Sequence, residues 1–120
     1  MLRTLSWMVF FVGLLAVIAL SVMPPGAIPN TGLSDKMGHM AAYAALALAG
    51  GIAIRGARSL LMLVAGLLLL GLGLELVQAL LPSRLASGHD ILANVVGITL
   101  GSTAAISKNT VMNRRPRTLD

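Results

Sequence analysis

The chain has 120 residues, of which 57% are hydrophobic and only 11% are charged, and its mean hydropathy is +0.89. A small soluble domain exposes a large fraction of its surface, so these values exclude an ordinary soluble protein and predict a membrane protein. The net charge of +5 does not indicate nucleic-acid binding, because the basic residues lie at the ends of apolar runs and form no stripe with interleaved aromatics. The absence of cysteine excludes disulfides and thiolate metal sites.

Four apolar segments predict four transmembrane helices, at about residues 5–23, 37–54, 60–81 and 90–106. A helix needs about 20 predominantly apolar residues to cross a bilayer, and no segment has the alternating polarity of a barrel strand. We therefore expect an all-α polytopic membrane protein whose residues 1–106 form one compact four-helix bundle. Residues 107–120 lack apolar periodicity and are expected to form a disordered basic tail near anionic lipid headgroups.

The first apolar segment follows Arg3, as the apolar region of a secretory signal peptide follows its basic start. It is longer than the usual 7–15 residues of such a region, and no clear A-x-A cleavage site follows it. We therefore expect a retained helix, with Trp7 as an interfacial anchor.

The second segment carries polar residues at its start. Asp35, His39 and Tyr43 follow one another at intervals of four residues, which puts them on one helix face, and Lys36 lies beside them. Asp35 also has a structural interpretation, because a negative charge stabilises the start of a helix. A further stripe of small residues consists of Ala41, Ala45, Ala49 and Ala53.

The third segment contains Glu75 in an otherwise apolar run that is also interrupted by Gln78. A charged residue at the centre of a transmembrane helix costs about 2.5–3.5 kcal/mol on insertion scales, so Glu75 is expected to face protein or water and to mark a functional site. Gln78 has a simpler interpretation as a hydrogen bond between helices. Pro82 ends the helix, and Arg84 beyond it can pair with Glu75 or with a lipid headgroup.

The fourth segment has Asp90, Asn94, Gly97 and Gly101 on one face. The G-x-x-x-G spacing of the two glycines favours close packing of membrane helices. Asp90 has a structural interpretation too, because Ser87 precedes it by three residues in a capping-box pattern. Asn94 either belongs to the ligand-binding site or forms a hydrogen bond to another helix.

The basic residues that flank the predicted helices predict the orientation, because cytoplasmic loops are enriched in Lys and Arg. One side has Arg3, Arg55, Arg58, Lys108, Arg114, Arg115 and Arg117, whereas the other has Lys36 and Arg84. Both termini are therefore expected in the cytoplasm, and a group of polar residues is expected on the extracytoplasmic side of the inner membrane. Its candidate ligand-binding residues are Asp35, Lys36, His39, Tyr43, Glu75, Gln78, Arg84, Asp90 and Asn94.

Four ordered motifs resemble the VanZ-like family of small bacterial membrane proteins. They are Asp35-Lys36-x-x-His39-x-x-x-Tyr43, Glu75-x-x-Gln78, Pro82-x-Arg84 and Asp90-Ile91-Leu92-Ala93-Asn94-x-x-Gly97-x-x-x-Gly101. Met40 and Ala86 depart from the pattern, in which aromatics are common after the histidine and after the arginine. The family is linked to resistance against the glycopeptide teicoplanin without an established reaction, so the resemblance implies an envelope protein and no particular chemistry.

Three kinds of function are compatible with these residues. The first is binding of an outer-leaflet lipid or a lipid-linked cell-wall precursor, or control of glycopeptide access to it. The second is a membrane enzyme that uses His39 with Glu75 or Asp90 as acid and base. The third, an ion- or proton-coupled transporter, is disfavoured because the polar residues gather near one membrane surface. No cofactor or metal is expected, and the glycine and alanine faces could also serve a homo-oligomer.

Overall fold

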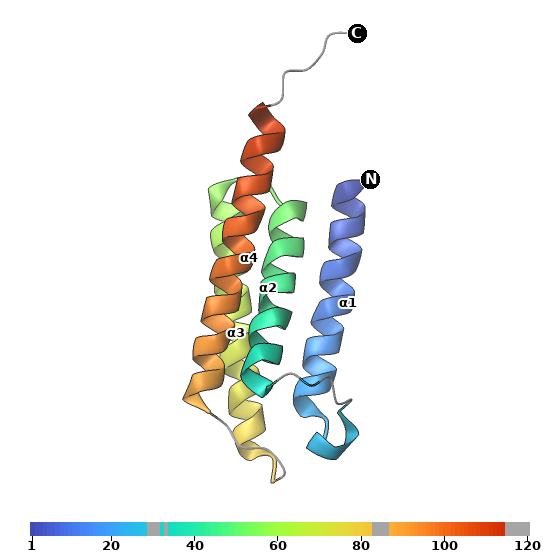
Figure 1. Ribbon diagram of the computed structural model, residues 1–120, viewed down its shortest axis with the longest axis vertical. Helices are drawn as coiled ribbons and strands as arrows, with labels where there is room; N and C mark the ends of the chain where they lie inside the picture. The colour runs from blue at the N-terminus through green and yellow to red at the C-terminus, as the bar shows by residue number, and fades with distance from the viewer. Residues whose placement is uncertain (29–31, 33, 83–86, 115–120) are drawn as a thin grey trace.

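A computed structural model describes residues 1–28, 32, 34–82 and 87–114. It contains the α-helices α1 (Leu2–Val22), α2 (Asp35–Ala53), α3 (Ala57–Leu80) and α4 (Gly88–Arg114), with a short 3-10 helix η1 (Pro25–Ala27) after α1 (Figure 1). The helices form a compact bundle, and the described ranges contain no strand. The prediction of an all-α fold with four long helices is confirmed.

The largest difference from the predicted boundaries concerns α4. This helix was expected to end near residue 106, yet it continues to Arg114, so the described part of the predicted disordered tail is helical. Residues 107–114 contain neither glycine nor proline, and the Asn109 side chain donates a hydrogen bond to the Gly51 carbonyl oxygen of α2. The prediction of disorder is wrong for residues 107–114, because apolar periodicity does not detect a polar helical extension that is held by a side-chain contact.

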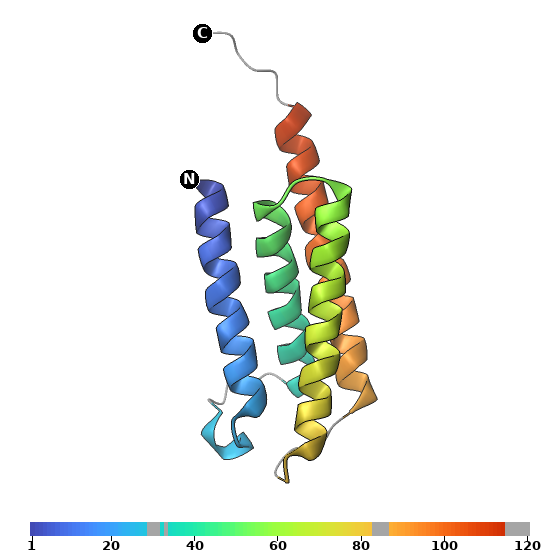
Figure 2. The ribbon, with the colours of Figure 1, turned by 180° about the vertical axis from the view of Figure 1, so that it is seen from behind.

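The four helices alternate in direction, so each end of the bundle collects particular termini (Figures 1 and 2). The upper end in Figure 1 holds the start of α1, the end of α2, the start of α3 and the end of α4. The lower end holds the end of α1, the start of α2, the end of α3 and the start of α4. The polar residues predicted to cluster at the starts of α2 and α4 and at the end of α3 therefore belong to the lower end.

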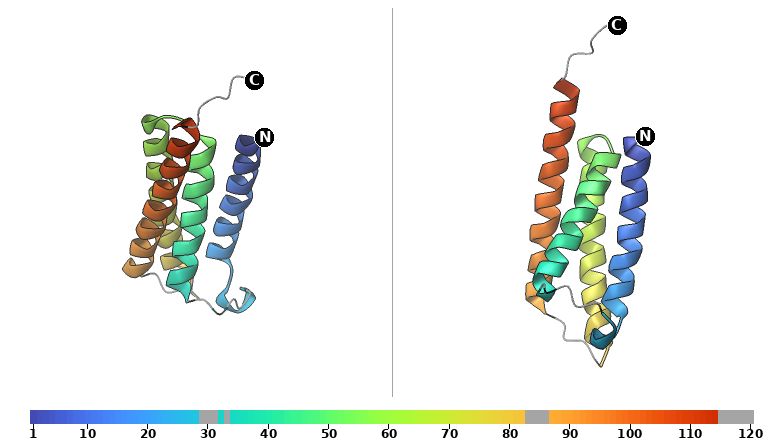
Figure 3. Two further views of the ribbon diagram at one scale, coloured as in Figure 1. Left: turned by 45° about the horizontal axis from the view of Figure 1, so that its top comes forward. Right: turned by 45° about the vertical axis from the view of Figure 1, so that its right-hand side comes forward.

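α2 is the central helix and lies between α1 and α4 (Figure 3). Its closest neighbour is α4, because two glycines of α4 leave room for the α2 backbone. A Cβ atom at Gly97 would lie 2.3 Å from the Met40 carbonyl oxygen, and one at Gly101 would lie 2.2 Å from the Ala44 carbonyl oxygen. Such contacts exclude any side chain at either glycine without a shift of one helix relative to the other.

The predicted alanine stripe of α2 is not a single packing surface. Ala49 and Ala53 are buried, whereas Ala41 and Ala45 are exposed. The face toward α4 carries Met40, Ala44 and Ala47 instead. A four-residue interval exceeds the 3.6-residue turn, so such a stripe rotates around the helix by about 40° per step and leaves the interface.

Three helices are long and apolar enough to cross a membrane among the described residues: α1, α3 and α4. Large apolar side chains on their outer faces, including Leu15, Leu69 and Leu100, are exposed by more than half. Apolar exposure along whole helices is unusual in a water-soluble monomer and is expected where helices face lipid. α2 does not meet the same hydropathy criterion. It carries its charged residues at its start and buries its middle, including Leu46 and Ala47, against its neighbours.

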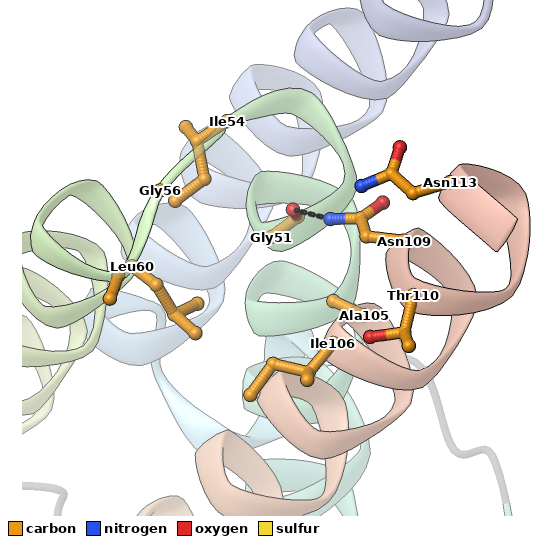
Figure 4. A pocket seen from close by; sticks show the side chains of 10 residues that line it. Gly51, Ile54, Gly56, Leu60, Ala105, Ile106, Asn109, Thr110 and Asn113 are labelled. Carbon is orange, nitrogen blue, oxygen red and sulfur yellow. Dashed lines mark hydrogen bonds between the residues drawn. The ribbon is translucent and has the colours of Figure 1, made fainter.

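Side chains from other helices bind the last carbonyl groups of α2 at the upper end. Arg3 Nε of α1 donates to the Ala53 carbonyl oxygen at 2.9 Å, and Asn109 Nδ2 of α4 donates to that of Gly51 at 3.1 Å (Figure 4). The last four carbonyl groups of a helix have no partner within the helix, and a cation there also suits the negative end of the helix dipole. A cavity of about 310 Å³ lies beside Asn109.

Ser102 of α4 is buried, and among the described residues its hydroxyl has no hydrogen-bond partner. A buried unpartnered polar group costs about 1–3 kcal/mol, so Ser102→Ala is expected to leave the free energy of unfolding unchanged or to raise it by about 1 kcal/mol. Reversible unfolding in detergent, followed by far-UV circular dichroism, measures this change. Thr103→Ala is the control, because that exposed hydroxyl already donates to the Thr99 carbonyl oxygen. A clear loss of stability in Ser102→Ala alone would contradict the prediction.

Candidate functional site

Residues of three helices meet at the lower end of the bundle. His39 and Tyr43 come from α2, Glu75 from α3 and Asn94 from α4. Tyr43, Glu75 and Asn94 are each at most 5% exposed, whereas His39 is only partly buried. We call these four residues the polar cluster.

A hydrogen bond between His39 and Asn94 joins the starts of α2 and α4. His39 Nδ1 lies 3.1 Å from Asn94 Oδ1. An amide oxygen only accepts, so Nδ1 carries the proton and donates it to Asn94. In the neutral imidazole Nε2 is then an acceptor, and it has no hydrogen-bond partner within the described ranges. The bond to Asn94 therefore orients the ring of His39, a partly buried residue, and leaves Nε2 as the nitrogen without a partner among the described residues.

Gly71 of α3 makes room for this arrangement, although the sequence analysis did not single it out. A Cβ atom there would lie 2.8 Å from Asn94 Nδ2 and 3.4 Å from the Tyr43 hydroxyl oxygen. Any larger residue would push the Asn94 amide away from α3. The sequence did hold one signal, since Gly71 precedes Glu75 by four residues and so shares its helix face.

Glu75 connects the end of α3 to the start of α4. Its Oε1 atom accepts a hydrogen bond from the backbone N–H of Ser87, the residue that precedes α4. A carboxylate at this position also lies near the positive end of the α4 dipole. The Tyr43 hydroxyl lies beside Gly71, which precedes Glu75 by one helical turn on the same face of α3. These contacts supply a structural reason for a carboxylate in an apolar helix.

The predicted capping box of α4 is realised only in part. The Ser87 hydroxyl accepts from the backbone N–H of His89 at 3.2 Å, as a capping serine does. The reciprocal bond, from the Ser87 N–H to a carboxylate, goes to Glu75 and not to Asp90. A local motif predicts only a local partner, and here a carboxylate from another helix takes that place. Asp90 is buried in the first turn of α4.

Gln78 does not join the polar cluster. Its Nε2 atom donates to the Ser21 carbonyl oxygen at 3.0 Å, which links α3 to the last turn of α1. The interpretation as a hydrogen bond between helices therefore describes Gln78 better than a role in ligand binding. The residue is buried, and its contact fixes the lower end of α1.

Asp35 and Lys36 are exposed in the first turn of α2, outside the buried part of the cluster. Ser34 caps this helix by accepting from the Met37 N–H at 3.3 Å, and Asp35 suits the positive end of its dipole. Lys36 precedes His39 by three residues, so the two side chains lie on neighbouring parts of the surface of α2. Arg84, the predicted partner of Glu75, lies outside the described residues, as does Ala86.

Among the described residues, the side chain of His39 is hydrogen-bonded to Asn94 and to no carboxylate. Within the described ranges no hydrogen bond joins His39 to Glu75 or Asp90, and the Glu75 carboxylate is occupied by a backbone N–H. In the same ranges no three His, Asp or Glu side chains are close enough to hold a metal ion. The site therefore presents the oriented imidazole of His39 and the exposed ammonium of Lys36. Both lie next to the buried residues of the polar cluster.

No protein-family model, curated protein or solved structure matches the chain. The resemblance to the VanZ-like family therefore depends on the four sequence motifs alone.

Proposed function

We propose that the chain is a VanZ-like protein of the bacterial inner membrane, with all four helices crossing the bilayer and both termini in the cytoplasm. The upper end would face the cytoplasm and the polar cluster the extracytoplasmic side. The distribution of charge supports this orientation, because cytoplasmic ends of membrane proteins are rich in Lys and Arg. Among the described residues, the lower end has Lys36, whereas the upper end has Arg3, Arg55, Arg58, Lys108 and Arg114.

At the extracytoplasmic surface the polar cluster binds the headgroup of an outer-leaflet lipid or of a lipid-linked cell-wall precursor. The observation that carries this proposal is the His39–Asn94 pair, which orients the imidazole and leaves Nε2 without a partner in the described structure. A headgroup hydroxyl can donate to Nε2, and a phosphate can pair with the neighbouring Lys36 ammonium. Binding of a precursor headgroup in this way would alter the access of glycopeptides to the precursor. This effect would agree with the link between the VanZ-like family and resistance against teicoplanin.

Replacing His39 with alanine is expected to weaken headgroup binding about two- to tenfold, since a hydrogen bond between a neutral imidazole and a hydroxyl contributes about 0.5–1.5 kcal/mol. The measurement uses the purified chain in nanodiscs, titrated with phosphatidylglycerol and with a polyprenyl-pyrophosphate-linked sugar peptide. Lys36→Ala should weaken the binding of the phosphate-bearing ligands in the same assay.

His89→Ala is the matched control, because His89 is an exposed histidine at the same end and contributes only its backbone to the contacts described. Equal binding by the wild type, His39→Ala and Lys36→Ala would refute headgroup binding at this site. Chemical turnover of the added ligand, lost in His39→Ala, would favour the membrane-enzyme alternative with His39 as the base.

A further inference from the structure

An apolar groove of about 500 Å³ lies between α1 and α3, two helices whose ribbons are seen in Figure 2. It is lined on α1 from Trp7 to Ile18 and on α3 from Ser59 to Leu70. Gly66 contributes to its depth, because a Cβ atom at that glycine would meet no other atom within 4 Å. The groove belongs to neither the polar cluster nor the cavity beside Asn109.

The length of the groove corresponds to one leaflet of a bilayer. Ile18 follows Trp7 by eleven positions and Leu70 follows Ser59 by eleven, which gives about 16 Å at 1.5 Å per residue. The hydrocarbon core of a membrane is about 30 Å thick, so half of it is about 15 Å. An acyl chain from a single leaflet fits this length, whereas a transmembrane helix would need a contact surface about twice as long.

Three arginines lie close in the sequence to the lining residues at the upper end of the groove. Arg3 precedes Trp7 by about one turn of α1, Arg55 follows the lining residue Ile54, and Arg58 precedes the lining residue Ser59. All three arginines are exposed, and the Arg3 Nε bond to the Ala53 carbonyl oxygen holds that guanidinium at this end.

No acidic residue offsets this charge in the described structure near the mouth. The acidic residues of the described ranges are Asp35, Glu75 and Asp90, and all of them belong to the lower end. The upper mouth therefore has a positive potential, and Arg groups bind phosphate well through their planar donor geometry.

We propose that the α1–α3 groove holds an acyl chain of one anionic phospholipid, whose phosphate is bound by Arg3, Arg55 and Arg58. The charge at the mouth selects an anionic headgroup, and the length of the groove selects a lipid from the adjoining leaflet. This site is at the opposite end from the polar cluster and is independent of the headgroup binding proposed there.

The test reconstitutes the full chain in nanodiscs with equal amounts of phosphatidylglycerol and phosphatidylcholine, releases it into detergent and counts retained lipids by native mass spectrometry. We expect phosphatidylglycerol to be retained at least tenfold over phosphatidylcholine. A Cβ atom at Gly66 would meet no other atom within 4 Å, so the side chain of Gly66→Trp should occupy the groove and reduce retention at least tenfold. Gly73→Trp is the matched control, because Gly73 is also exposed on α3, has no atom within 4 Å of an added Cβ and does not line the groove.

A second pair of variants tests the charge without altering the packing. The double substitution Arg55→Gln and Arg58→Gln should bring the ratio of the two retained lipids close to one. Arg114→Gln, which removes a charge from the end of α4, should preserve the preference. Equal retention of both lipids by the wild type, or equal losses in Gly66→Trp and Gly73→Trp, would overturn the proposal. A dimer that dissociates in Gly66→Trp would overturn it in favour of a second copy of the chain.

Discussion

Substituting alanine for Gly97 or Gly101 is expected to lower the free energy of unfolding by about 1–3 kcal/mol in each case. The added Cβ would lie 2.3 Å from the Met40 carbonyl oxygen or 2.2 Å from that of Ala44. These are backbone atoms, so the clash is relieved only by moving α4 away from α2. The loss should outweigh the advantage of about 1 kcal/mol that alanine has over glycine in helix propensity. Reversible unfolding in detergent, monitored by circular dichroism, provides the measurement.

Gly73→Ala is the control for both substitutions. Gly73 lies on α3, and a Cβ atom there would have no neighbour within 4 Å. The variant should match the wild type or exceed its stability by about 1 kcal/mol, because only helix propensity changes. If Gly97→Ala proved as stable as Gly73→Ala, the close approach of α2 and α4 would be wrong. Because this interface also positions Asn94 next to His39, Gly97→Ala should weaken headgroup binding as well.

Glu75→Ala is expected to destabilise the protein by about 1–3 kcal/mol, because the Ser87 N–H loses its acceptor. Glu75→Gln should retain most of the stability, since the amide oxygen can accept the same hydrogen bond. Unfolding in detergent measures the loss, and hydrogen exchange at the Ser87 amide reports the contact directly. Exchange there should accelerate in Glu75→Ala and change little in Glu75→Gln.

The comparison between the two substitutions separates a hydrogen bond from a charge effect. Equal destabilisation by alanine and glutamine would mean that the negative charge near the start of α4 matters more than the acceptor. Leu76→Ala is a suitable control, because Leu76 is 61% exposed on the outer face of α3 and its loss removes no internal contact of that kind. If the wild type turned over a lipid ligand and a stable Glu75→Gln variant did not, the carboxylate would instead take part in proton transfer.

Several features of the fold could be predicted from local sequence patterns. Apolar run length and glycine or proline breaks locate the four helices, because hydropathy depends only on the residues of each segment. The accumulation of polar residues at the starts of α2 and α4 and at the end of α3 is also visible in the sequence. Family membership, membrane orientation and the headgroup ligand remain predictions.

The partners of the polar residues could not be predicted in the same way. Asn94 contacts His39 as expected of neighbours at one end of a bundle, but Gln78 turns toward Ser21 of α1. Helical periodicity assigns a residue to a face of its own helix without specifying which neighbour covers that face. The extension of α4 to Arg114 was missed for a related reason, since its bond from Asn109 to Gly51 joins helices far apart in the sequence.

By itself, the sequence determined that this is an all-helical protein with an apolar exterior and that a carboxylate in an apolar helix needs a partner, because both follow from the cost of exposing polar groups to hydrocarbon. The tertiary structure decided which partner Glu75 has. That choice depends on the relative rotation and depth of the helices, which are set by close contacts such as Gly97 against Met40 and Gly71 beside Asn94. Within this packing Glu75 accepts from the Ser87 backbone, while the ring of His39 is oriented by its hydrogen bond to Asn94.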